Sequence, residues 1–252
     1  MVKILILTCM HKRPAISELF LKSLKRFIKA APSDYEIDVM CVVTDYNPSF
    51  EYNYGWVNFD YHSNDFISNK WNYGIEKALE WQWDYLFLTD DDDFFLHSLW
   101  DAYAPLIEKG EHYFGLKSIY FHDLPTSETI AFTYRIDRII GCGRMISRKC
   151  VEDCVPLMES GLNRGLNNSL DDRLKKLGYK HKLIEGTFAL DIKTKHNIWQ
   201  IENYQAFSVG ASPNVIYKFL NEDEVKFLNT IDNEGNYTTI ADGPNDGIMQ
   251  KR

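Results

Sequence analysis

Four consecutive aspartates, Asp90 to Asp93, have the residue type and spacing that most clearly predict chemistry in this 252-residue sequence. Like charges a few ångströms apart raise one another's pKa, so such a run costs free energy unless a cation offsets the repulsion. Carboxylate oxygens are hard ligands that favour Mg²⁺ or Mn²⁺, and either ion needs only one or two of them when phosphate oxygens complete its shell. We therefore predict that aspartates of this run hold a divalent cation.

The segment before the aspartates supports this interpretation. Tyr85 to Leu88 is a short apolar run that predicts a buried strand leading straight into the acids. A solvated acidic turn is the ordinary alternative for such a run, and it fits a central strand less well. An EF-hand is excluded because the sixth position counted from Asp90 is Phe95 rather than glycine.

Strand and helix signals alternate along the first part of the chain. The apolar runs Lys3 to Thr8 and Ile37 to Val43 predict strands. Apolar residues at helical spacing predict helices from Ile16 to Ile28 and from Asn69 to Trp81. This alternation favours parallel βαβ units, whose ligands bind beyond the carboxyl ends of the strands. Asp45, just after the second strand, is therefore predicted at the same edge as the aspartate run.

The rest of the chain shows a different order of predicted strands and helices. Its pattern predicts strands at 113–123 and 129–140, helices at 147–158 and 170–177, a strand at 181–184 and a helix after Asn221. Loops are predicted at 46–65 and 161–169, and the polar stretch 232–252 is predicted to be a loose tail. Since no repeat or linker interrupts the chain, we expect one domain.

Composition narrows the class of protein. With 28 Lys and Arg against 36 Asp and Glu the net charge is −8, which disfavours a nucleic-acid partner. Five cysteines without CxxC spacing indicate reduced thiols and a cytoplasmic location rather than a disulfide framework or zinc site. The N-terminal apolar run, Ile4 to Leu7, is too short to span a membrane, while docking to a membrane surface stays open.

The aromatic content is high, at 14% of residues. Core packing is the plain explanation for most of these rings. The second explanation is that some rings stack on a base or on a sugar face.

The segment Tyr85 to Asp92 resembles the strand and DXD-type motif of GT-A glycosyltransferases, family 2 in particular. In that group these aspartates hold the metal on the donor diphosphate, so the resemblance implies Asp90, Asp91 and Asp92 as metal ligands. The resemblance implies an α/β, Rossmann-like GT-A fold with a mixed, mostly parallel sheet flanked by helices. It implies a single domain over 1–231, with a donor-binding half at about 1–95 and an acceptor half at about 96–231.

Three further stretches fit the donor half of that family. Leu5 to Pro14 is similar to its first strand and nucleotide-binding loop, which implies donor contacts from Thr8 and Arg13. Asp45 falls where the second strand of the family ends in a uracil-contacting acid. Asn69 to Gly74 resembles a helix-opening pattern in which Lys70 replaces the usual arginine. The resemblance therefore adds two residues of that helix, together with the first aspartate of the run, to the predicted donor contacts: Lys70, Asn72 and Asp90.

The acceptor half offers candidates for catalysis. Ser169 to Leu174 resembles the acidic motif near the acceptor of inverting members, where a carboxylate deprotonates the attacking hydroxyl. This implies Asp171 or Asp172 as the general base, whereas an acid pair that caps a helix N-terminus is the structural alternative. His196 lies where some GT-A enzymes supply a further metal ligand, although a lone histidine is more often an ordinary surface or core residue.

The sequence thus predicts a glycosyltransferase that uses Mn²⁺ or Mg²⁺. Its donor would be a nucleotide-diphosphate sugar, with UDP favoured, and its acceptor a hydroxyl of a carbohydrate, lipid or other molecule, with inversion at the anomeric carbon. Two other classes stay open. A nucleotidyltransferase is expected to carry a glycine-rich phosphate loop, and residues 9–14 contain no glycine. A non-catalytic carbohydrate-binding module would account for the aromatic residues and the acidity.

Overall fold

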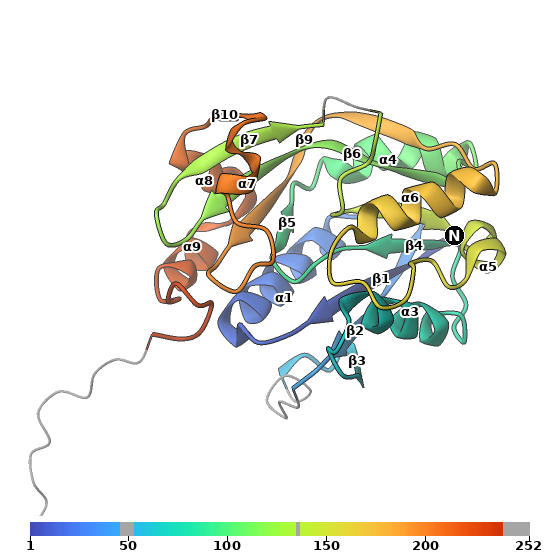
Figure 1. Cartoon of the computed structure of the whole chain (residues 1–252), viewed down its shortest axis with the longest axis horizontal. Helices are drawn as coiled ribbons and strands as arrows, with labels where there is room; N and C mark the ends of the chain where they lie inside the picture. Colours follow the sequence, from blue (N-terminus) through green and yellow to red (C-terminus); the bar gives the residue numbers. More distant parts are fainter. Residues whose placement is uncertain (46–52, 135–136, 239–252) are drawn as a thin grey trace, which may run out of the picture.

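The computed structural model describes residues 1–45, 53–134 and 137–238 of the chain. It shows a large mixed sheet with helices packed on both faces (Figure 1). The strand order along the main path of the sheet is β10-β7-β6-β8-β4-β1-β2-β3, and β9 pairs with both β5 and β6. The expected α/β single domain is confirmed.

The strands have the following bounds: β1 Val2–Met10, β2 Tyr35–Val43, β3 Asn58–Tyr61, β4 Tyr85–Leu88, β5 Asp93–Phe95, β6 Tyr113–Asp123, β7 Thr129–Thr133, β8 Arg144–Ser147, β9 Lys182–Lys193 and β10 Ser208–Gly210. The helices are α1 Pro14–Lys29, α3 Ile67–Ala78, α4 Leu99–Glu108, α5 Arg148–Cys154, α6 Leu166–Lys176, α7 Glu202–Gln205, α8 Ile216–Phe219 and α9 Glu222–Leu228, with a 3-10 turn at Pro213–Val215.

The central part of the sheet is parallel. β3, β2, β1 and β4 all run in the same direction, and β1 pairs with β2 along its whole length. Their carboxyl ends therefore meet at one edge, where Asp90 follows β4 and Asp45 follows β2. Antiparallel strands extend the sheet beyond β4, and most of the paired positions in the whole sheet are parallel, as expected.

Two apolar clusters cover the two faces of β1. Ile4 and Ile6 point to the cluster that includes side chains of α1 and α4, while Leu5 and Leu7 point to the cluster of α3, α5 and α6. This alternation follows from the two-residue period of a strand. Because β1 is buried on both sides, its carboxyl end is held rigidly next to the aspartate run.

A glycine allows α3 to approach the sheet closely. A Cβ atom added to Gly74 would lie 2.7 Å from a methyl group of Val42 and 3.1 Å from one of Leu7. The glycine of the Asn69 to Gly74 motif therefore has a packing role. Only a residue without a side chain permits this distance between helix and sheet.

Two strands were not predicted at their observed positions. The strand expected at 129–140 ends at Thr133, and the chain then returns to form β8 at 144–147, where a helix was expected to begin. The apolar pair Ile139 and Ile140 misled the prediction because both side chains are buried without belonging to a strand. The strand expected at 181–184 continues to Lys193, through irregular pairing with β6.

The predicted loop at 46–65 contains the short edge strand β3, and residues 46–52 of that loop lie outside the described residues. Predicted helices are found at shifted bounds: 16–28 is α1, 69–81 is α3, 147–158 is α5 and 170–177 is α6. All five cysteines are buried and none forms a disulfide. Among the described residues, no helix combines the length and the apolarity needed to cross a bilayer.

Candidate functional site

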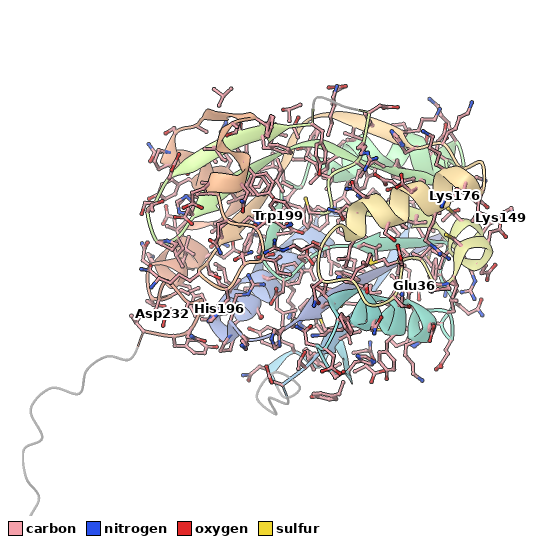
Figure 2. All side chains as sticks on the ribbon, viewed as in Figure 1. Glu36, Lys149, Lys176, His196, Trp199 and Asp232 are labelled. Atoms are coloured by element: carbon pink, nitrogen blue, oxygen red, sulfur yellow. The ribbon has the colours of Figure 1, made fainter. Side chains whose placement is uncertain are left out.

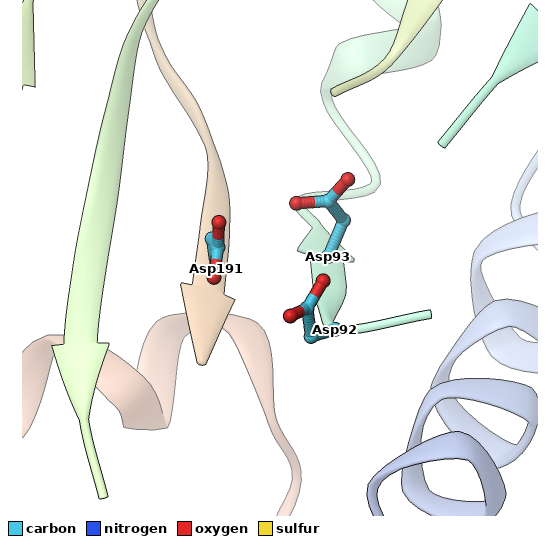
Figure 3. Close-up of side chains that lie close together, drawn as sticks. All are labelled: Asp92, Asp93 and Asp191. Carbon is cyan, nitrogen blue, oxygen red and sulfur yellow. The ribbon is translucent and has the colours of Figure 1, made fainter. Parts of the chain in front are cut away.

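Carboxylates gather where β4, β5 and β9 meet. Asp93, at the start of β5, pairs across the antiparallel ladder with Asp191 of β9. Asp92 joins them, and one carboxylate oxygen from each of the three lies within 4.8 Å of the others (Figure 3). Directly opposed like charges on neighbouring strands repel, so this arrangement needs compensation.

Arg13 supplies part of that compensation. Its guanidinium donates to Asp91 Oδ1 at 2.5 Å and to Asp92 Oδ2 at 2.7 Å. The other oxygen of Asp91 accepts a hydrogen bond from Ser17 Oγ at 2.5 Å. Both oxygens of Asp91 are therefore engaged by protein groups. A guanidinium suits this role because its planar donors match two carboxylates at once.

Lys193 and Asn197 hold the cluster from the β9 side. Lys193 Nζ donates to Asp191 Oδ2 at 2.5 Å, and Asn197 Nδ2 donates to Asp92 Oδ2 at 2.6 Å. The loop that carries Asn197 is fixed in turn, since the backbone N–H of Thr194 donates to Asn197 Oδ1 at 2.7 Å. These contacts orient the carboxylates before any ligand arrives.

The cluster carries more negative charge than its cations neutralise, and three pKa values reflect this. Burial, then repulsion by Asp191, raises the pKa of Asp93 well above its usual range. Burial is also the largest cause that raises the pKa of Asp191 to about 7. The pKa of Asp90 is raised to about 7 by burial and by its acidic neighbours. Since the Asp90 residue is exposed to solvent, repulsion is the firmer of those two causes.

Arg13 lies against both Asp91 and Asp92, but their pKa values shift in opposite directions. For Asp91, burial raises the pKa more than Arg13 lowers it. For Asp92, burial also raises the pKa, but the charges of Arg13 and Lys193 outweigh it and the net shift is downward. Asp92 is therefore the member of the cluster most firmly held as an anion.

The donor set fits a divalent cation better at Asp92, Asp93 and Asp191 than at the predicted Asp90, Asp91 and Asp92. Asp191 Oδ1 is buried and accepts no hydrogen bond in the described part of the chain. A buried carboxylate oxygen without a donor is costly unless a ligand completes it. Asp91, by contrast, already has partners for both oxygens.

A cleft of about 370 Å³ opens beside the carboxylates. Strands β1 and β2 lie on one side of β4 in the sheet, and β6 and β7 lie on the other. The first side of the cleft is lined by cationic and polar residues: His11, Lys12, Arg13, Asn64 and Lys70. The other side carries the aromatic wall: Phe121, Phe132, Tyr134, Trp199 and Tyr204.

Only some of the residues predicted to contact the donor line the cleft. Arg13, Lys70 and Asp90 line the cleft, whereas Thr8 and Asn72 do not. Lys70 is fully buried and its Nζ donates to Met10 O at 2.5 Å and to the hydroxyl of Thr44 at 2.7 Å, so it ties the ends of β1 and β2 together. The hydroxyl of Thr8 is buried without a partner among the described residues.

Asn72 and Asp45 are not among the residues that line the cleft. The side-chain amide of Asn72 donates to Met158 O at 2.8 Å and its oxygen accepts from Met158 N at 3.0 Å, which joins α3 to the segment after α5. Asp45 is exposed at the end of β2, with Oδ2 3.7 Å from Nδ1 of His11. Since His11 lines the cleft, Asp45 lies at its rim.

The predicted bases, Asp171 and Asp172, are on α6 and are not among the residues that line the cleft. Asp171 accepts a hydrogen bond from the Tyr113 hydroxyl and lies 3.3 Å from Nη1 of Arg144. Asp172 is 3.8 Å from Nη2 of Arg138 on a more exposed face. Asp171 is therefore held by Tyr113 and by Arg144, which itself lines the cleft, whereas Asp172 faces Arg138, which does not line it.

His196 lines the cleft and forms an ion pair with Glu234, Nε2 to Oε2 at 2.8 Å. Residues 231–238 form a turn that holds this region together. The carbonyl of Gly235 accepts from the backbone N–H groups of Ala15 and Ile16 at the start of α1. The described part of the stretch 232–252 thus packs beside Arg13, while residues 239–252 lie outside the described residues.

Sequence reasoning missed Asp191 and Asn197. The strand prediction ended at 184, so the acid that faces Asp93 was not placed in the sheet. An available signal was the single carboxylate inside the otherwise apolar run Ala189 to Ile192, because an acid in a buried strand demands a partner. Asn197 had no signal of its own, since an amide two residues from a lysine is ordinary in a loop.

The parallel centre of the sheet, with acids at the end of β4 and helices on both faces, defines an α/β protein of GT-A-like fold. Among solved structures it is similar to S. aureus TarS, with a TM-score of 0.56 at 12% identity over 77% of this chain and 37% of that one. A structure of TarS 1-349 gives a TM-score of 0.54 at 12% identity, over 76% of this chain and 60% of that one.

At this level of identity the likeness shows a shared fold. The chain spans less than two thirds of either TarS structure. Its sequence matches no protein-family model. It also matches no curated protein.

Proposed function

We propose that the chain is a metal-dependent glycosyltransferase that transfers a sugar from a nucleotide-diphosphate donor, with UDP the favoured nucleotide, to an acceptor hydroxyl. The observation that carries the proposal is the cluster of carboxylates that lines a cleft, with one oxygen of Asp191 that has no hydrogen-bond partner within the described ranges. The fold shared with TarS supports a transferase of this kind. The likeness of the aspartate segment to family 2 supports an inverting reaction.

The proposed role of the cluster follows from the chemistry of the leaving group. Breaking the bond between the anomeric carbon and the diphosphate leaves negative charge on the phosphate oxygens. Asp92, Asp93 and Asp191 would hold Mn²⁺ or Mg²⁺, which supplies Lewis-acid stabilisation of that charge. Arg13 orients Asp92 for this task and adds positive charge at the same edge.

The acceptor hydroxyl is a weak nucleophile at neutral pH, so a carboxylate within hydrogen-bond reach accelerates its attack about a hundredfold or more. Asp171 and Asp172 stay our candidates from the family motif. Asp90 competes with them because it lines the cleft and is exposed to solvent. Comparing Asp90→Asn with the double variant Asp171→Asn/Asp172→Asn, by turnover and by donor binding, distinguishes the two assignments.

Thermal unfolding with nucleotides tests the class of enzyme directly. UDP, GDP, CDP and their sugar conjugates would be added with and without Mn²⁺. We expect UDP and a UDP-sugar to raise the melting temperature only when the cation is present. A ligand at a hundred times its dissociation constant stabilises by about 2.7 kcal/mol.

The outcome separates the competing classes. Slow hydrolysis of a UDP-sugar that needs Mn²⁺ and is lost in Asp191→Asn supports the glycosyltransferase. Release of pyrophosphate from a nucleoside triphosphate would indicate a nucleotidyltransferase instead. No effect of any nucleotide, with or without the cation, would leave a non-catalytic binding module and overturn the proposal.

A further inference from the structure

The aromatic wall is a continuous set of rings in contact. Tyr204 of α7 stacks on Phe121 of β6, with ring centroids 4.2 Å apart and an interplanar angle of 24°. Phe132 meets Tyr204 edge-on at 5.2 Å and Tyr134 at 5.1 Å. Trp199 lies 6.2 Å from Tyr204 at a tilt of 48°. Such offset and edge-on contacts fix the rings and make the wall rigid.

The wall leads from solvent to the carboxylates. Trp199 is 45% exposed, in the loop before α7 (Figure 2), whereas Phe121 is only 4% exposed. At the inner end, Lys193 Nζ lies 4.9 Å from the centroid of Phe121 and 5.8 Å from that of Tyr204. The same Nζ contacts Asp191. A molecule lying along these rings therefore has its inner end beside the proposed reaction centre.

The mouth of the cleft also carries polar side chains. Arg164, in the loop before α6, places its guanidinium carbon 5.8 Å from the centroid of Trp199. Asn167 of α6 also lines the cleft and packs against Gly141, where an added Cβ would meet the Asn167 amide at 2.6 Å. Since Gly141 has no side chain, the amide has room beside the cleft. An aromatic face with amide and guanidinium donors beside it is a combination that fixes a ring carrying hydroxyl groups.

We propose that Trp199 forms the outer subsite for the acceptor, and that the acceptor is a glycan whose sugar ring stacks on the indole face while Arg164 and Asn167 hydrogen-bond its hydroxyl groups. This inference rests on the proposed function, since it assigns the acceptor side of that same cleft. Tyr204, deeper in the wall, directs the next unit of the acceptor toward Asp90 and Asp191.

Two other acceptors fit the mouth less well. A lipid chain would leave the hydrogen-bond donors of Arg164 and Asn167 without partners where it covers them. A polynucleotide would stack on the rings equally well, but the net charge of −8 and the acidic cluster beneath the wall repel its phosphates. The combination of stacking and neutral or cationic hydrogen-bond donors favours an uncharged sugar ring.

Glycan binding by the whole chain tests the subsite. The protein would be applied to a printed array of α- and β-linked oligosaccharides, and the best ligand titrated by calorimetry. We expect Trp199→Ala to weaken binding at least tenfold and Trp199→Tyr to retain most of it. Tyr217→Ala is the matched control, because Tyr217 is 60% exposed and does not line the cleft. It should bind like the unchanged chain.

The readouts separate this inference from the proposed function. If UDP and Mn²⁺ raise the melting temperature of the unchanged chain but glycan binding survives Trp199→Ala, the subsite is overturned and the proposed function stands. Trp199-dependent glycan binding without any nucleotide effect would support the subsite while the proposed reaction fails. Binding of lipid micelles or single-stranded DNA in place of every glycan would also overturn the subsite. Should Trp199→Ala not fold, Arg164→Gln tests the same mouth at an exposed position.

Discussion

At the scale of single residues, the carboxylate cluster carries repulsion that the neighbouring cationic side chains offset only in part. Five aspartates lie close to the cations Arg13, Lys193 and Lys70, so negative charge remains in excess. Burial, together with this excess of negative charge, raises the pKa of Asp93. Groups that disfavour their own charged form in the resting protein are typical of functional sites, where a ligand repays the strain.

Asp93→Asn is therefore expected to stabilise the protein in the absence of a cation while it weakens cation binding. An asparagine oxygen can still accept the hydrogen bonds from the Thr89 hydroxyl, at 3.1 Å, and from Asp90 N, at 2.9 Å. The charge is lost and the hydrogen bonds are kept. Relief of one buried repulsion is worth about 1 kcal/mol or more, a rise of about 2–4 °C in melting temperature for a chain of this size.

Thermal unfolding with and without Mn²⁺ measures both effects. Asp38→Asn serves as the control, because Asp38 is exposed on β2 and should change neither quantity. A variant Asp93→Asn that melts earlier than the unchanged protein without a cation, or that keeps the full Mn²⁺ shift, would contradict the assignment of Asp93.

At the scale of elements, the sequence predicted strands and helices correctly where apolar residues follow one clear period along the element. β1, β2 and β4 were found in place because their apolar runs are short and bounded by polar turns. The aspartate run was found because its charge density has few explanations. These signals are local, so a sequence alone carries them.

The remaining elements depend on long-range pairing. The predicted strand at 181–184 ended before β9 does. The reason is that β9 shifts register in its pairing with β6, and Gly186 adopts φ 102 near that irregularity. β8 was missed because it is only four residues long and is defined by its neighbours β4 and β6. The partner of Asp93 therefore became visible only once β9 was placed beside β5.

The turn at 231–238 is far from Arg13 in sequence, yet we expect this turn to position the Arg13 side chain. Gly235 has φ 86, which strains any other residue, and a Cβ there would lie 2.8 Å from Cβ of Arg13. Gly235→Ala should therefore displace Arg13 from Asp91 and Asp92 and cost about 1–3 kcal/mol of unfolding free energy. Urea unfolding and the Mn²⁺ shift measure the two consequences.

Gly55→Ala is the matched control for that variant. Nothing lies within 4 Å of a Cβ at Gly55, and its backbone is outside the left-handed region. Its unfolding free energy should stay close to that of the unchanged protein. Equal stability and equal cation response in Gly235→Ala would show that the turn does not position the arginine.

At the scale of the whole molecule, the pH dependence of stability combines every titrating group. Burial is the largest cause that lowers the pKa of three histidines, His11, His97 and His122. A histidine kept neutral in the fold is protonated more readily in the unfolded chain. Its contribution to stability is therefore complete above the unfolded pKa of about 6.5 and is lost as the pH falls toward the folded value.

His122 allows this contribution to be isolated, because it is 5% exposed and its Nδ1 lies 2.8 Å from the Thr129 hydroxyl. In His122→Asn the amide can keep that contact without titrating, so unfolding free energy should fall less steeply than in the unchanged protein as the pH drops below about 6.5. One proton accounts for at most about 1.4 kcal/mol per pH unit. Urea unfolding at several pH values, with His62→Asn as a partly exposed control, measures the slopes. Identical slopes for His122→Asn and the unchanged protein would mean that folding leaves the pKa of His122 unchanged, against the expected downward shift.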